Sequence, residues 1–208
     1  MKTGAPTRLL PWSHAHRSFE GRSSRFYDVL ARRLLRRVYR RIADDIATVA
    51  PAGGAVLDVG TGPGILLSEL AARRPDLHVT GVDLSADMVA IAERNIGQYA
   101  DRASARVADV TDLPFDACTF DVIATSFSLH HWEDIPQAVP ELARVLRPAG
   151  RLCVYDFKRA PFDVLDATAR ANGSFAEEAE HTVIRTGHLH IWRIARHILS
   201  AGDHEGGR

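Results

Sequence analysis

The chain has 208 residues, with 26 basic and 26 acidic side chains and 46% apolar residues. This length and apolar content suit one globular domain and exclude wholesale disorder. The two cysteines, Cys118 and Cys153, exclude a disulfide framework and a cysteine-rich zinc site. The sequence has no apolar run of the roughly 18 residues that span a bilayer, and residues 1–12 lack a signal-peptide core. We therefore expect a cytoplasmic protein.

The zero net charge is the sum of two unequal parts. Residues 1–50 hold 11 basic against 4 acidic side chains, whereas residues 51–208 hold 15 against 22. Within the basic part, residues 24–49 carry apolar side chains at steps of three or four, which predicts an amphipathic helix. Six arginines between Arg32 and Arg41 fall on the opposite arc of that helix. This face either meets water or docks on anionic lipid or another partner, and no recognition module accompanies it that would indicate specific nucleic-acid binding.

From residue 55 the sequence alternates between strand and helix patterns. The expected strands are residues 55–59, 78–82, 104–108, 120–125, 151–156, 182–185 and 191–196. The expected helices are residues 65–74, 86–96, 134–146 and 162–171. This alternation predicts an α/β fold, a Rossmann-like seven-stranded and mostly parallel sheet with helices on both faces.

One proline conflicts with this pattern. Pro140 lies inside the helical stretch 134–146, where an interior proline costs about 3 kcal/mol. We therefore predict that this helix begins near Pro140 and that residues 133–139 form a turn.

A glycine-rich turn joins the first strand to the first helix of the alternating region. Gly60, Gly62 and Gly64 follow the buried strand in a G-x-G-x-G spacing. Glycine permits a positive φ and a close backbone approach to a ligand, and the helix that follows offers free N–H groups to an anion. The alternative is a turn that merely needs glycine.

Acidic side chains stand at the ends of three successive strands. They are Asp58, Asp83 and Asp109, and parallel strands bring such positions to one edge of the sheet. Asp83, 19 residues after Gly64, could accept hydrogen bonds from both ribose hydroxyls of an adenosine-containing cofactor. Alternatively it caps the next helix, although Ser85 could fill that position instead.

Together these segments resemble the class I S-adenosylmethionine-dependent methyltransferases. The matching pieces are LDVGTGPG at 57–64, GVDLSADMVAIA at 81–92, VADVTDLPF at 107–115, FDVIATSFSLHHW at 120–132 and LARVLRPAGRL at 142–152. The last two are most similar to the small-molecule branch, which includes ubiquinone and menaquinone biosynthesis methyltransferases. The chain departs from the usual family text in having RPAG where RPGG is common. The resemblance implies a cofactor-binding methyltransferase domain over residues 51–200, preceded by a lead-in and basic cap helix over residues 1–50.

The resemblance also implies roles for individual residues toward S-adenosylmethionine. The residues expected around its methionine part are Asp58, Gly60, Thr61, Gly62 and Gly64. Those expected at its ribose and adenine are Asp83, Leu84, Met88, Asp109 and Val110, and those beneath its sulfonium are Ser126 and Phe127. In the segment before the first strand, the residues expected to line the acceptor pocket are Phe26, Tyr27 and Leu30.

Two histidines follow the fourth strand of the sheet directly. Either His130 or His131 could take the proton from a hydroxyl acceptor, because imidazole titrates near neutral pH. Alternatively both only shape the pocket wall, and a carbon acceptor that is already acidic needs no base. Histidines elsewhere, such as His188 and His190, lack a convincing ligand set, so we expect no metal site.

The expected reaction is O- or C-methylation of a small molecule, of an aromatic or quinone-like kind. Two other readings stay open. A nicotinamide-dependent oxidoreductase has the same fold, but its G-x-G-x-x-G fingerprint needs a third glycine where this chain has Ile65. A non-catalytic cofactor-binding or interaction protein would keep the glycine turn without an acceptor pocket. The sequence does not indicate the acceptor or the oligomeric state.

Overall fold

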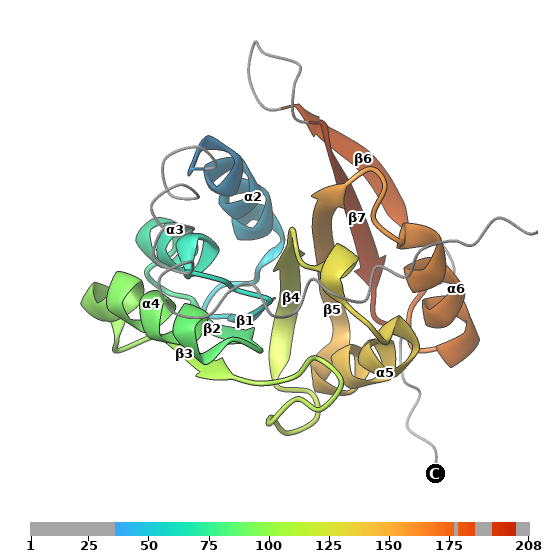
Figure 1. The fold of residues 1–208 in the computed structure, drawn as a ribbon, viewed down its shortest axis with the longest axis horizontal. Coiled ribbons are helices and arrows are strands. Elements are labelled where there is room, and N and C mark those ends of the chain that lie inside the picture. Colours follow the sequence, from blue (N-terminus) through green and yellow to red (C-terminus); the bar gives the residue numbers. More distant parts are fainter. Residues whose placement is uncertain (1–35, 177–178, 186–192, 203–208) are drawn as a thin grey trace, which may run out of the picture.

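A computed structural model describes residues 36–176, 179–185 and 193–202 (Figure 1). Its strands are β1 (Ala55–Val59), β2 (His78–Asp83), β3 (Ala103–Val107), β4 (Phe120–Ser126), β5 (Leu146–Phe157), β6 (Glu180–Arg185) and β7 (Arg193–Ser200). Its helices are α2 (Arg36–Val49), α3 (Ile65–Arg73), α4 (Ala86–Ile96), α5 (Ile135–Val145) and α6 (Phe162–Asn172), with short 3₁₀ turns η2 (Gly97–Tyr99) and η3 (Leu129–His131).

The seven strands form one sheet in the order β3-β2-β1-β4-β5-β7-β6. Strands β1 to β5 are parallel, and β7 runs antiparallel to both β5 and β6. The predicted α/β fold with a mostly parallel sheet is confirmed. The order reverses between β1 and β4, and ligands of such sheets bind where the order reverses, beyond the carboxyl ends of the strands.

Helices cover both faces of the sheet because its central strands are apolar on both sides. Figure 1 shows α2, α3 and α4 on one side of the sheet and α5 and α6 on the other. One core cluster joins α2 and α3 to the sheet through residues such as Ile42 and Leu67, and the other joins α5 and α6 to it through residues such as Leu142 and Leu165. This two-sided burial fixes the positions of the loops at the carboxyl edge.

The prediction that the helix of residues 134–146 begins near Pro140 is wrong, because this helix, α5, begins at Ile135. Asp134 caps it, since its side chain accepts a hydrogen bond from the Gln137 amide at 2.9 Å. Pro136 lies in the first turn of the helix, where no amide donor is needed. Pro140 lies in the helix interior, where it removes one backbone hydrogen bond. The apolar stripe of α5 is buried on the sheet, and this burial outweighs the proline's cost.

The strands at the far edge differ in extent from the prediction. β5 begins five residues earlier than expected and contains an irregularity, because Phe120 pairs with Leu146 while Val122 pairs with Arg151. β7 ends at Ser200 rather than at residue 196. The segment between β6 and β7, residues 186–192, lies outside the described residues.

The described part of the basic helix shows the predicted two faces. The apolar stripe of α2 is buried, with Ile42 and Ile46 fully inaccessible. The exposed arginines are Arg36, Arg37, Arg40 and Arg41. Asp45 anchors this helix to the sheet, because one of its oxygens accepts from the Tyr155 hydroxyl at 2.7 Å and from Arg196 at 2.5 Å. None of the described helices is both long enough and apolar enough to span a membrane.

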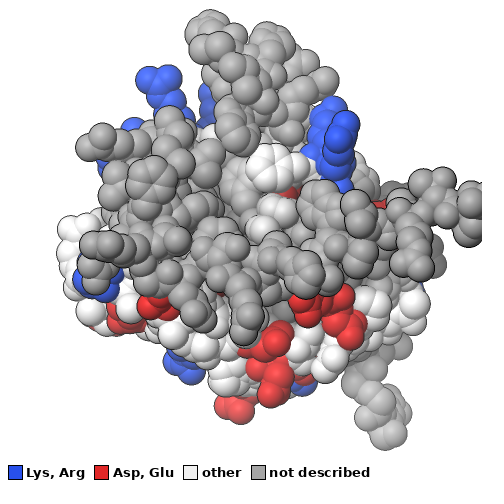
Figure 2. Space-filling view, in the orientation of Figure 1, with Lys and Arg blue, Asp and Glu red and all other residues white. Residues whose placement is uncertain are grey.

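Figure 2 shows the charges on the face viewed in Figure 1. Acidic side chains gather toward the lower part of this face, and several basic side chains project at its upper edge.

Candidate functional site

The glycine loop after β1 is held by the backbone of β2. The amides of Gly60 and Thr61 both donate to the Val82 carbonyl at 2.9 Å, and the Gly62 amide donates to the Asp83 carboxylate at 2.8 Å. Gly60, Gly62 and Gly64 have φ values of 71°, 53° and 73°, in the left-handed region that favours glycine. The predicted need for glycine here is therefore confirmed as a backbone requirement.

The absence of a side chain at Gly60 also allows the loop after β4 to lie against the glycine loop. A Cβ atom on Gly60 would lie 2.0 Å from the Ser128 hydroxyl oxygen, which also accepts from the Trp132 indole at 2.9 Å. The segment that contains His130 is thereby packed against the glycine loop.

Asp58 lies beneath this loop and is fully buried. Its Oδ2 atom accepts from the Thr61 hydroxyl at 2.7 Å, whereas Oδ1 has no hydrogen-bond partner among the described residues. Burial raises the pKa of Asp58 to about 7; the Thr61 hydrogen bond opposes the shift and the Asp83 charge adds to it. A buried carboxylate with a spare oxygen is suited to a cationic or hydrogen-bond-donating ligand.

Asp83 ends β2 beside the same loop. Its carboxylate accepts from the amides of Gly62 and Ser85, at 2.8 Å and 2.9 Å. Burial raises the pKa of Asp83, while these two amide hydrogen bonds lower it. Ser85 caps α4 by accepting from the Met88 amide at 3.3 Å, so the cap does not require Asp83.

The residues expected at the adenine differ in exposure. Leu84 is 64% exposed, an unusual state for a large apolar side chain directly after a buried strand. Met88 is buried. Asp109 is exposed, and its Oδ1 accepts from the Thr111 amide and hydroxyl, while Val110 next to it is partly buried. Leu84 and Asp109 thus follow neighbouring strands at one edge.

The end of β4 carries backbone strain. Ser126 is buried, and Phe127 has a φ of 56° although it is not glycine. Such a conformation costs of order 1–3 kcal/mol, and residues in it cluster at active sites and ligand-binding turns. The Phe127 amide donates to the Tyr155 carbonyl at 2.8 Å, and its ring lies against Tyr39 and Phe157. These contacts hold the strained turn in place.

His130 and Asp156 form a dyad at the ends of β4 and β5. The His130 Nδ1 atom lies 2.8 Å and 3.0 Å from the two carboxylate oxygens of Asp156, and the His130 amide contacts Oδ2 at 3.2 Å. Asp156 is fully buried, whereas the His130 side chain is 30% exposed. The centroid of the His131 ring lies 4.0 Å from that of the His130 ring, with the two rings tilted at 41°.

Sequence reasoning missed Asp156 and Ser128. Asp156 ends a predicted strand, as Asp58 and Asp83 do, and this shared position was the signal that could have found it. The predicted acceptor residues Phe26, Tyr27 and Leu30 lie outside the described residues.

Comparison with known proteins identifies the family of this region. Residues 56–150 match the family described as a methyltransferase domain. This match confirms the resemblance of the region to methyltransferases. The chain is 37% identical over 142 residues to the ubiquinone/menaquinone biosynthesis C-methyltransferase UbiE of Geotalea daltonii, covering 65% of this chain and 60% of that protein.

Two further proteins are similar to this chain, one in sequence and one in fold. The 27-O-demethylrifamycin SV methyltransferase of Amycolatopsis mediterranei is 36% identical over 125 residues, covering 58% of this chain and 46% of that protein. The chain thus spans less than two thirds of the length of these curated relatives. A TehB-like S-adenosylmethionine-dependent methyltransferase from Corynebacterium glutamicum has the same fold, with a TM-score of 0.68 and 20% identity over 86% of this chain and 97% of that one.

The TehB-like protein is named as dependent on S-adenosylmethionine, and residues of this chain suit that molecule. The spare buried oxygen of Asp58 suits an ammonium group, the open side of Gly62 suits the close approach of a ligand, and exposed Leu84 suits the face of an aromatic base. These three features lie at the carboxyl edge of the sheet, where ligands of such sheets bind.

Proposed function

We propose that the protein transfers a methyl group from S-adenosylmethionine to an oxygen or carbon of a small organic acceptor, with His130 as general base. The observation that carries this proposal is the His130–Asp156 dyad, which lies on the segment packed against the cofactor loop through Ser128. The names of the relatives support both kinds of acceptor atom, since one is a C-methyltransferase of quinone biosynthesis and the other acts on 27-O-demethylrifamycin SV.

The cofactor, when bound, supplies an activated methyl group and its own leaving group. The protein then has to bind it, align the acceptor and remove a proton. In our proposal the Gly60–Gly64 loop and Asp58 hold the methionine part, and Asp83 accepts from the ribose hydroxyls. Leu84 and Met88 pack on the adenine, Asp109 and Val110 lie at its edge, and Ser126 and Phe127 close the site near the sulfonium.

The dyad favours His130 over His131 as the base. The Asp156 carboxylate can only accept, so the Nδ1 atom of a neutral His130 carries the proton and Nε2 keeps its lone pair. Nε2 can then take the proton from a hydroxyl or an acidic carbon as the methyl group transfers. Asp156 acts here as a positioning residue, because it fixes the tautomer and the orientation of the ring.

Variants of the dyad test this assignment. The assay is transfer of labelled methyl from S-adenosylmethionine to a panel of phenols and hydroquinones, with cofactor affinity measured separately by calorimetry. We expect His130→Ala to lower kcat by about 10² or more with cofactor affinity unchanged. We expect Asp156→Asn also to lower kcat, because an amide can donate to Nδ1 and place the proton on Nε2.

His131→Ala is the matched control, since it removes the adjacent ring. A loss of rate in His131→Ala with a normal rate in His130→Ala would reject the assignment. Cofactor binding without transfer to any member of the panel would favour a non-catalytic binding protein instead.

The cellular setting is part of the same proposal. A cytoplasmic location suits two free cysteines, one buried and one exposed. The exposed arginines of α2 are the part of this proposal that would contact anionic lipid, and two of them, Arg36 and Arg40, also pair with Glu69 of α3.

A further inference from the structure

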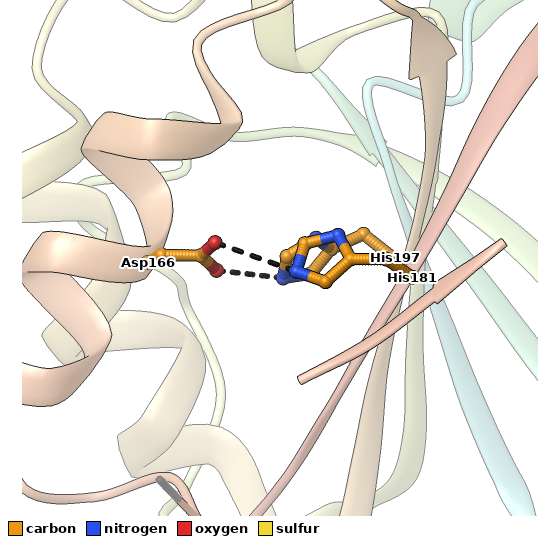
Figure 3. Close-up of side chains that lie close together, drawn as sticks. All are labelled: Asp166, His181 and His197. Carbon is orange, nitrogen blue, oxygen red and sulfur yellow. Dashed lines mark ion pairs between the residues drawn. The ribbon is translucent and has the colours of Figure 1, made fainter. Parts of the chain in front are cut away.

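A cluster of two histidines and one aspartate lies between α6 and the terminal hairpin. His181 of β6 and His197 of β7 are directly opposite each other in the antiparallel pair. Asp166 projects from α6 toward both imidazole rings (Figure 3). The potential ligand atoms of all three residues lie within 4.8 Å of one another.

The distances in this cluster match those between ligands of one small cation. His197 Nε2 lies 2.7 Å from Asp166 Oδ1, and His181 Nε2 lies 3.7 Å from Asp166 Oδ2. An ion about 2.1 Å from each of its ligands in a tetrahedron requires ligand atoms about 3.4 Å apart. The two observed separations, which run to the two oxygens of one carboxylate, lie on either side of this value.

The buried histidine gives independent support for a ligand. His197 is fully buried, and its Nδ1 atom has no hydrogen-bond partner in the described part of the chain. Its Nε2 atom lies 2.7 Å from Asp166 Oδ1, and neither of these two atoms has another hydrogen-bond partner among the described residues. Leaving buried polar groups unpaired is costly, and metal coordination is one way in which such groups are satisfied.

Packing around the cluster holds His197 in position. The Phe162 ring stacks on the His197 ring at 5.5 Å with an interplanar angle of 19°, and the His181 ring meets His197 edge-on at 3.9 Å. His181 is 59% exposed and opens one side of the cluster to water. Three protein ligands and a water in the fourth position are a common arrangement for zinc.

We propose that Asp166, His181 and His197 bind one zinc-type divalent cation that joins α6 to the β6–β7 hairpin. Two imidazole nitrogens and one carboxylate oxygen suit Zn²⁺, Co²⁺ or Ni²⁺ better than Mg²⁺ or Ca²⁺, which prefer oxygen ligands. This site uses none of the residues proposed for the cofactor or the base, so it stands independently of the proposed methyl transfer. This proposal departs from our expectation that the chain has no metal site.

The test is calorimetric titration of Zn²⁺ into tag-free, chelator-treated full-length protein. We expect saturable binding of one ion per chain, at least tenfold weaker in Asp166→Asn and in His181→Ala. His78→Ala is the matched control, because it removes an exposed histidine from β2. His197→Ala should also lose binding, but it deletes a buried ring, so the two milder variants decide the outcome if it fails to fold.

A spectroscopic readout separates this site from scattered surface histidines. Co²⁺ in a tetrahedral site gives intense visible absorption bands, and we expect these bands in the native protein and in His78→Ala but not in Asp166→Asn. Zn²⁺ should also raise the melting temperature of the native protein and leave that of Asp166→Asn unchanged. Equal Zn²⁺ affinity in all variants, or no saturable binding to the native protein, would overturn the proposal and leave an ion-free side-chain cluster.

Discussion

The contact between Gly60 and Ser128 gives the sharpest prediction about the fold of the site. Substitution Gly60→Ala places a Cβ atom 2.0 Å from the Ser128 hydroxyl oxygen, at a backbone φ of 71°. Both the side-chain collision and the left-handed backbone should destabilise the variant. Gly62→Ala is the matched control, because Gly62 has a φ of 53° but no heavy atom within 4 Å of the added carbon.

The magnitudes follow from these two terms. A left-handed alanine costs about 1–2 kcal/mol, and forcing apart packed atoms adds about 1–3 kcal/mol. Gly60→Ala should therefore lose about 2–5 kcal/mol of unfolding free energy, and Gly62→Ala only about 1–2 kcal/mol. With a urea m-value of about 2–3 kcal/mol per molar, the Gly60→Ala midpoint should fall by about 1–2 M.

Urea unfolding followed by circular dichroism measures both variants. Adding Ser128→Gly to Gly60→Ala should restore the part of the unfolding free energy that the side-chain collision removes. A double-mutant cycle of these two substitutions isolates that part. Equal losses in Gly60→Ala and Gly62→Ala, or no recovery in the double variant, would refute the reasoning that Ser128 packs against the loop.

Two further predictions concern pH and backbone strain. Because burial raises the pKa of Asp58 from 3.8 to about 7, the folded protein retains a proton there that the unfolded chain has released. The contribution of Asp58 to the free energy of unfolding should therefore fall by at most about 4 kcal/mol as the pH rises from about 4 to 7. Above pH 7 this contribution should stay constant. Urea unfolding of the native protein and of Asp58→Asn at pH 5 and pH 8 measures this contribution. The same difference in unfolding free energy between the two proteins at both pH values would contradict the prediction. Ala149 has a φ of 59°, so Ala149→Gly should stabilise the protein by about 1 kcal/mol. The same substitution in the exposed helical residue Ala72 should destabilise by about 1 kcal/mol, and thermal unfolding compares the two.

The sequence was most informative where structure depends on local pattern. Asp58 and Asp83 were predicted at one edge because a buried strand pattern precedes each, and parallel strands bring their carboxyl ends together. The glycine turn was predicted for the same reason, since the strand, turn and helix are contiguous. These features need no knowledge of how distant segments pack.

Features that depend on strand register could not be predicted. The contact of His130 with Asp156 requires β4 and β5 to pair in the register that places Ser126 beside Tyr155. The cluster of Asp166, His181 and His197 requires His181 to lie opposite His197 in the β6–β7 pair, and α6 to pack over that pair. Pro140 was misjudged because its local cost was weighed without the burial of α5 on the sheet.

Binding of S-adenosylmethionine to Asp83 variants tests the central claim most directly. Calorimetric titration should show that Asp83→Ala binds the cofactor at least about 100-fold more weakly, because two charge-assisted hydrogen bonds of about 1.5–3 kcal/mol each are lost. Asp101→Ala, which removes an exposed aspartate before β3, should bind as the native protein does. Equal affinity in Asp83→Ala and Asp101→Ala would contradict the account of the site.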